Sequence, residues 1–279
     1  MKSFELKGKN GKPIICDLRF NEKGENKPLI IFCHGFKGFK DWGHFNLIAD
    51  QFSKNGFIFL KFNFSHNGGT MEEPIDFPDL EAFGENDYIK ELNDIEVLLD
   101  SIEKGVISKE LTNWNKKIFL IGHSRGGGIA ILKAYEDQRI DKVVTWAGVS
   151  NLLNRLPDEI KLKKWKESGV YWIKNGRTHQ NMPMYYSFVE VLYSNKERLN
   201  IQKACENLTI PQLIIHGSSD EAVSFSEGER MQSWNENSVF FNVKLAGHTF
   251  GGKHPFQELE LPKHSKIIVE KTIQFLNAQ

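Results

Sequence analysis

The feature that most constrains this chain is an alternation of short apolar runs with segments of helical periodicity. Six runs rich in Ile, Val, Leu and Phe follow the first 27 residues, and most of them are nearly continuous. Such runs are typical of strands covered on both faces in a parallel sheet. We expect strands over 28–34, 56–64, 116–123, 141–148, 211–217 and 238–248.

Helices are predicted between these strands. Apolar residues at helical spacing follow Asp41, recur over 88–102 and close the chain over 262–278, and Gly56 is a plausible end for the first helix. The opening segment, 4–20, looks like an antiparallel hairpin turned around "GKNGKP". A hairpin followed by alternating strands and helices predicts an α/β fold with a doubly wound, mostly parallel sheet.

The stretch "GHSRGG" places one serine among close-set glycines at the end of the third central run. Ser124 lies between Gly122 and Gly126 in the pattern G-x-S-x-G, just before the helix "GGGIAILKAYED". A serine on a sharp strand-to-helix turn needs neighbours without side chains, because the backbone is strained and the helix packs tightly on the strand. A glycine-rich helix start that cradles a phosphate is the alternative interpretation.

Candidates for a base and an orienting acid follow the serine in chain order. Asp220 comes just after the run 211–217, and His248 lies in the loop after the next run, so both should share one sheet edge with Ser124. A serine hydroxyl needs such a base, and the base needs a carboxylate to orient it. The alternative acid is Glu221, and the alternative bases, His254 and His264, are expected at the surface.

Two backbone amides are predicted to stabilise an oxyanion. The residue after the nucleophile supplies one, here Arg125, and the loop "FCHGFKGFKDW" supplies the second, which we assign to Phe36 with Lys37 as the alternative. In the same region, His34 should brace the loop by hydrogen bonding, and His123 should pack against or orient the turn.

These four segments, "HGFKGFKDW", "GHSRGG", "HGSSDEAV" and "AGHTFGG", together resemble the serine α/β-hydrolase superfamily. Their spacing is most similar to its dienelactone-hydrolase-like and esterase branches, and the likeness runs from about Pro28 onward. Dienelactone hydrolases proper use a cysteine nucleophile, whereas this chain has Ser124, so that narrower activity is not implied. The resemblance implies one α/β-hydrolase domain over 1–279, with a helical cap or lid inserted over 150–205.

The expected cap is rich in aromatic residues. Trp172, Tyr185 and Tyr186 are candidates for a substrate-binding wall, although aromatics at such spacing also serve to hold a cap to the body of the protein. The guanidinium of Arg125, beneath the cap, should be partly desolvated and therefore needs a carboxylate. That partner is either an acidic residue of the protein, for instance in the loop 72–81, or a carboxylate on the substrate.

Composition excludes several other classes of function. Lys plus Arg and Asp plus Glu both number 36, and no single-sign run suggests nucleic acid as a partner. No window has the roughly 20 apolar residues of a membrane helix, and no secretory leader opens the chain, so the cytoplasm is the expected location. Three cysteines without a CxxC pair argue against a disulfide framework or a zinc cluster.

The sequence therefore predicts a serine hydrolase that cleaves carboxylic esters of small acids, a small-molecule substrate, and no metal or organic cofactor. Hydrolysis of an aminoacyl or peptide bond, or acyl transfer, would use the same three residues and stays open. A non-catalytic α/β-hydrolase that binds a small ligand is a hypothesis from another class. The pattern leaves the oligomeric state open.

Overall fold

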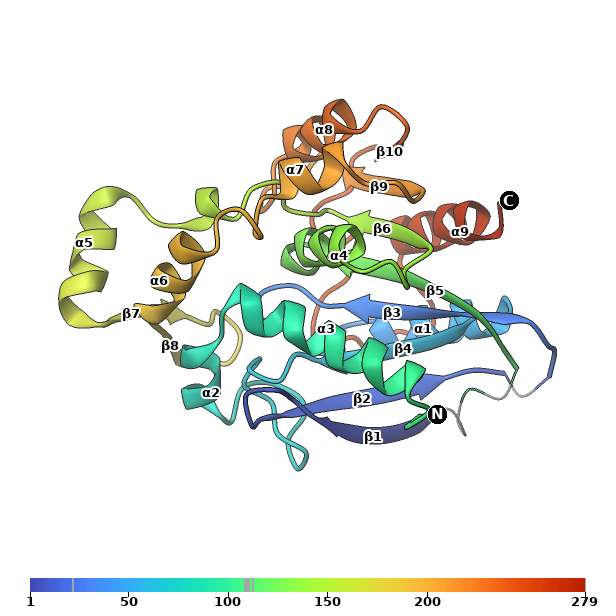
Figure 1. Ribbon diagram of the computed structural model, residues 1–279, viewed down its shortest axis with the longest axis horizontal. Helices are drawn as coiled ribbons and strands as arrows, with labels where there is room; N and C mark the ends of the chain where they lie inside the picture. The colour runs from blue at the N-terminus through green and yellow to red at the C-terminus, as the bar shows by residue number, and fades with distance from the viewer. Residues whose placement is uncertain (22, 108–110, 112, 279) are drawn as a thin grey trace.

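The computed structural model describes residues 1–21, 23–107, 111 and 113–278. Within these residues, eight strands form one twisted sheet in the order β1-β2-β4-β3-β5-β6-β9-β10 (Figure 1). The strands are β1 (Lys2–Lys7), β2 (Pro13–Arg19), β3 (Lys27–Cys33), β4 (Ile58–Asn63), β5 (Trp114–His123), β6 (Lys142–Trp146), β9 (Gln212–Gly217) and β10 (Val239–Val243). Each strand predicted from an apolar run is present.

The sheet is parallel except at its N-terminal edge. Strands β3, β4, β5, β6, β9 and β10 pair in parallel, whereas β2 is antiparallel to both β1 and β4. The predicted doubly wound sheet with an N-terminal hairpin is confirmed. Because the parallel strands all end at the same edge, the loops that follow them converge there.

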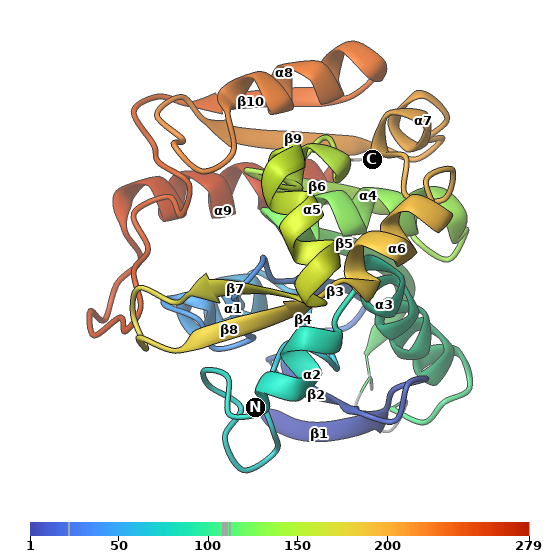
Figure 2. The ribbon, with the colours of Figure 1, turned by 90° about the vertical axis from the view of Figure 1, so that its left-hand side faces the viewer.

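Helices cover both faces of the sheet (Figure 2). One face carries α1 (Phe45–Lys54) and α9 (Lys263–Asn277), and the other carries α3 (Tyr88–Glu103), α4 (Arg125–Glu136), α7 (Ile201–Glu206) and α8 (Phe225–Trp234). Each face has its own apolar core, so the central strands are buried on both sides. This burial explains their nearly continuous apolar sequences. Helix α1 ends at Lys54, and Gly56 follows with a left-handed φ of 87°, the conformation for which glycine is favoured.

The segment of residues 147–200, between β6 and α7, leaves the sheet and packs beyond its carboxyl edge. It contains a short 3₁₀ turn (Leu153–Arg155), α5 (Glu159–Ser168), α6 (Ser187–Ser194) and an antiparallel pair, β7 (Val170–Lys174) and β8 (Asn181–Tyr185). The helices were expected, and the strand pair was not. Figure 2 shows this segment in front of the sheet edge, beside α2 (Leu80–Glu85), which interrupts the long loop after β4.

Among the described residues, no helix combines the length and the apolar character needed to cross a bilayer.

Candidate active site

Ser124 lies on a strained turn between β5 and α4. Its backbone has φ 58° and ψ −122°, a region that residues with side chains rarely adopt. The flanking glycines leave no space for a side chain: a Cβ on Gly122 would overlap the carbonyl of Gly126, and one on Gly126 would overlap the carbonyl of Cys33. The glycines are therefore required by the sharp strand-to-helix turn that the sequence predicted.

Three side chains from three loops form a continuous hydrogen-bonded chain. His248 Nε2 lies 2.9 Å from Ser124 Oγ, and His248 Nδ1 lies 2.8 Å from Asp220 Oδ2. Asp220 follows β9 and His248 follows β10, whereas Ser124 follows β5. Glu221, the alternative acid, is exposed to solvent, and the side chain that contacts the imidazole is that of Asp220.

The Asp220 side chain is fully buried but remains ionised. Burial alone would raise its pKa, yet hydrogen bonds from two histidines and from the Val223 N–H hold the pKa of this carboxyl well below its usual range. Its Oδ1 accepts the backbone N–H groups of Ala222 and Val223, both at 2.9 Å. An ionised carboxylate at this position favours the imidazole tautomer with hydrogen on Nδ1, which leaves Nε2 free to accept from the serine hydroxyl.

Two further histidines support this chain of hydrogen bonds, and sequence reasoning predicted this role for neither of them. His123, which was expected to pack against or orient the turn at Ser124, instead donates from Nε2 to the backbone carbonyl of His248 at 2.9 Å and so orients the His248 loop. His216 was missed: it is completely buried, and its Nε2 lies 3.0 Å from the Val223 carbonyl and 3.5 Å from Asp220 Oδ2. The available signal was its place at the end of a strand, four residues before the aspartate.

The loop after β3 approaches Ser124 closely at Gly35. The N–H of Gly38 donates to the carbonyl of Gly35 at 3.0 Å, which closes a turn with Phe36 and Lys37 at its centre. A Cβ on Gly35 would lie 2.9 Å from the Ser124 Cβ, so glycine is needed for this close approach. The amide of Arg125 is the first of α4 and therefore has no partner within the helix.

His34 braces this loop with both ring nitrogens. Its Nδ1 donates to the Gly35 carbonyl at 2.9 Å, and its Nε2 accepts the Phe64 N–H at 3.3 Å. Burial lowers the pKa of His34 to about 4, so the ring is neutral at pH 7 and can fill both roles.

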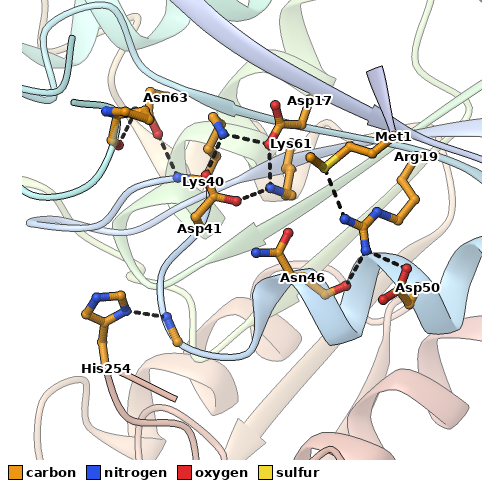
Figure 3. Close-up of polar contacts among 12 residues, drawn as sticks. Met1, Asp17, Arg19, Lys40, Asp41, Asn46, Asp50, Lys61, Asn63 and His254 are labelled. Carbon is orange, nitrogen blue, oxygen red and sulfur yellow. Dashed lines mark hydrogen bonds and ion pairs between the residues drawn. The ribbon is translucent and has the colours of Figure 1, made fainter. Parts of the chain in front are cut away.

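Four charged side chains, three of them buried and Asp41 partly buried, form the ion quartet (Asp17, Lys40, Asp41 and Lys61) at the C-terminal end of the same loop (Figure 3). The ammonium groups of Lys40 and Lys61 lie 2.6 Å and 2.7 Å from Asp17 Oδ2, and both also pair with Asp41. Lys61 is completely buried on β4, and Asp17 comes from β2. The two lysines and two aspartates balance in charge, and each contacts both groups of opposite sign. Because Asp17 and Lys61 lie on β2 and β4, these ion pairs tie the loop to two strands.

Two cavities meet at Ser124 and His248. The first, about 370 Å³, is mostly apolar and extends under the segment between β6 and β9. The second, about 360 Å³, extends toward the loop after β3 and the segment after His248. Both volumes fall within the range of small-molecule sites.

The aromatic residues predicted to line the site are not those that do so. Trp172 is 58% exposed, the Tyr185 hydroxyl donates to Glu81 at 2.6 Å, and neither they nor Tyr186 line the two cavities. The first cavity is instead lined by Trp165 and Tyr171. The correction follows from strand alternation, since Tyr171 faces inward on β7 and Trp172, its neighbour, must face out.

Arg125 lines the first cavity, and its charge has a partner within the protein. The guanidinium lies 3.2 Å from Glu91 Oε1 on α3, not from an acid of the loop 72–81. Its Cζ also lies 4.1 Å from the Phe36 ring centroid and 5.1 Å from that of Tyr88. Burial raises the pKa of Glu91, and Arg125 and Asn86 oppose that shift.

Comparisons with known proteins identify the fold. Residues 28–171 match the family model described as alpha/beta hydrolase fold. Est1E from Butyrivibrio proteoclasticus, solved with ferulic acid bound, is 18% identical and superposes with a TM-score of 0.72 over 98% of this chain and 97% of that one. A putative hydrolase from Agrobacterium vitis S4 is 14% identical, with a TM-score of 0.74 over 99% of both chains.

A monoacylglycerol lipase from Paleococcus ferrophilus is 15% identical, with a TM-score of 0.64 over 94% of this chain and 98% of that one. No curated protein matches by sequence. At these identities the structural likeness shows the fold, and the family model covers about half of the chain. The chain therefore belongs to the α/β-hydrolase fold family.

Proposed function

We propose that this protein is a serine hydrolase that cleaves carboxylic esters of small acids through an acyl-enzyme intermediate. The observation that carries the proposal is the chain of hydrogen bonds from Ser124 through His248 to Asp220, with distances of 2.9 Å and 2.8 Å. This chain lies where two cavities meet, so an ester bond bound across them would present its carbonyl to the serine.

In the proposed reaction, Ser124 Oγ attacks the ester carbonyl while His248 Nε2 takes its proton. The same proton then passes to the leaving alkoxide, and an acyl-serine forms. Water, deprotonated by His248, attacks the acyl carbon, and the acid departs as Ser124 regains its proton. Asp220 holds the imidazole in position and stabilises its charged form during both half-reactions.

The backbone amides of Phe36 and Arg125 are proposed to donate to the oxyanion of each tetrahedral intermediate. Both residues line the first cavity beside Ser124, and Phe36 lines the second as well. The rigid attachments of the loop after β3, through His34 and the ion quartet, support a preorganised role for the Phe36 amide.

We also propose that residues 150–205 act as a cap over the site within a single domain. This segment supplies Trp165, Tyr171 and Phe188 to the apolar cavity and Asn175 and Arg177 to the other. Closure by such a cap would exclude water from the reacting carbonyl.

A hydrolysis screen over p-nitrophenyl esters of increasing chain length, with aminoacyl amides included, tests the proposal. We expect ester hydrolysis, covalent labelling by a fluorophosphonate probe, and loss of turnover by about 10⁴-fold or more in Ser124→Ala. Ser226→Ala, which changes an exposed serine on α8, is the matched control and should keep full activity. Retention of more than a tenth of turnover in Ser124→Ala would reject this nucleophile, and preferential cleavage of amides would replace the esterase assignment.

A further inference from the structure

The second cavity differs from the first in the charges that line it. Among the described residues, Lys37 and Arg177 line the second cavity and no aspartate or glutamate does. The first cavity also has two cationic side chains, but Arg125 pairs with Glu91 and Arg155 pairs with Glu227. The cations of the first cavity are thus neutralised within the protein.

Lys37 has no such partner. It forms no ion pair with any carboxylate in the part of the chain that the structure describes, and its ammonium lies 5.9 Å from the Phe36 ring centroid. Arg177, by contrast, pairs with Asp76. Lys37 is half-buried, so its unpaired charge lies where a bound anion would be only partly screened by water.

The backbone at Lys37 gives a second indication. Its φ is 54°, in the left-handed region, at the third position of the turn from Gly35 to Gly38. Glycine adopts this conformation without strain, whereas a residue with a side chain is disfavoured there. Strain of this kind concentrates at functional sites, and here it places a lysine one residue after the amide proposed to bind the oxyanion.

A neutral histidine, His254, lines the same cavity. Its Nδ1 accepts the backbone N–H of Gly43 at 2.8 Å, a contact drawn in Figure 3. Burial lowers the pKa of His254, with the Arg177 charge acting in the same direction, so the ring is neutral at pH 7. Because Nδ1 accepts, the hydrogen is on Nε2, and the ring, stacked at 6.3 Å on Trp42, is one of the groups that line the cavity.

We propose that the second cavity is a binding site for a carboxylate carried by one half of the ester substrate, with Lys37 as its charged ligand and His254 as a second donor. The apolar first cavity then takes the uncharged half. This inference rests on the proposed esterase function and specifies its substrate class as esters with one anionic end. A carboxylate suits the site because it can accept from an ammonium and an imidazole N–H together.

Matched ester pairs test the proposal kinetically. One pair places the charge in the leaving group, 3-carboxyphenyl butyrate against 3-carbamoylphenyl butyrate. The other places it in the acyl group, the 4-nitrophenyl monoester of glutaric acid against that of glutaramic acid. We expect the ratio of kcat/KM for the anionic over the neutral ester to exceed one in at least one pair. In that pair Lys37→Met should lower the ratio about tenfold.

Two variants make the kinetic result specific. Lys37→Arg keeps the charge and should retain most of the ratio. Lys253→Met removes a charge from an exposed side chain that does not line the cavity, and it should leave the ratio unchanged. An equal fall in both members of a pair, or the same loss in Lys253→Met, would overturn the proposal.

A binding measurement separates this proposal from the esterase assignment. Calorimetric titration of Ser124→Ala with benzoate and with benzamide requires no turnover. We expect benzoate to bind more tightly, and the preference to weaken about tenfold when Lys37→Met is added. Lys37-dependent benzoate binding without hydrolysis of any ester would reject the esterase function alone. Equal binding of the two probes would reject the carboxylate site, whatever the kinetics of hydrolysis.

Discussion

Replacement of Arg125 by methionine should destabilise the protein through the carboxylate that it leaves behind. The guanidinium is 11% exposed, and the Glu91 side chain, 3.2 Å away, is 4% exposed. Methionine keeps much of the contact with the Phe36 and Tyr88 rings but removes the charge. Among the described residues, the Asn86 side chain, 2.8 Å from Glu91 Oε1, is then the one remaining hydrogen-bond partner of the Glu91 carboxylate, since Oε2 has none there.

The magnitude follows from this burial. Removing one partner of a buried ion pair costs about 3–5 kcal/mol. At about 2 °C per kcal/mol for a chain of this size, the melting temperature should fall by at least about 6 °C. The loss should shrink as the pH is lowered from 8 to 5. The raised pKa of Glu91 rises further without Arg125, and protonation removes the uncompensated charge.

Thermal unfolding of a double-mutant cycle measures the effect. Arg125→Met combined with Glu91→Gln should be more stable than Arg125→Met alone, because the buried charge is gone while the Asn86 contact remains. Activity should fall to a similar extent on neutral and anionic esters, since the partner of Arg125 is internal. Additive losses in the cycle, or an unchanged melting temperature in Arg125→Met, would refute the reasoning.

Three further predictions concern the other charges of the molecule. Asp220→Asn should lower kcat by about 10⁴-fold, because it disturbs the imidazole tautomer, while Glu221→Gln stays close to wild type; the reverse ranking in a steady-state assay would move the acid to Glu221. Lys61→Met should cost about 3–5 kcal/mol in urea unfolding, against less than about 1 kcal/mol for Lys104→Met in an exposed pair, and equal losses would contradict an anchoring role for the ion quartet. Burial raises the pKa of Asp94 to about 7, so the stability that its protonated form contributes is present below about pH 4 and is lost as the pH rises through 7. Asp94→Asn should therefore flatten the dependence of the free energy of unfolding on pH in this range, and an unchanged dependence would contradict the raised pKa.

The alternation of apolar runs was sufficient to predict the layered α/β sheet. Continuous apolar strands and helical stripes are local patterns, and the positions of strand ends follow from them. The shared edge of Ser124, Asp220 and His248 could be predicted for the same reason, because parallel strands place the loops that follow them side by side. The sharp turn at Ser124 could also be predicted from the sequence, since only glycine fits at positions 122 and 126.

The partners of buried side chains depended on tertiary packing. The two orientations of β7 differ only in which alternate residues face the cavity, and nothing in "VYWIK" decides between them, so Tyr171 rather than Trp172 lines the site. Glu91 reaches Arg125 because α3 packs against α4, 34 residues away along the chain. Sequence periodicity indicates which face of a helix is buried, but the opposing residue is set only when the helices meet.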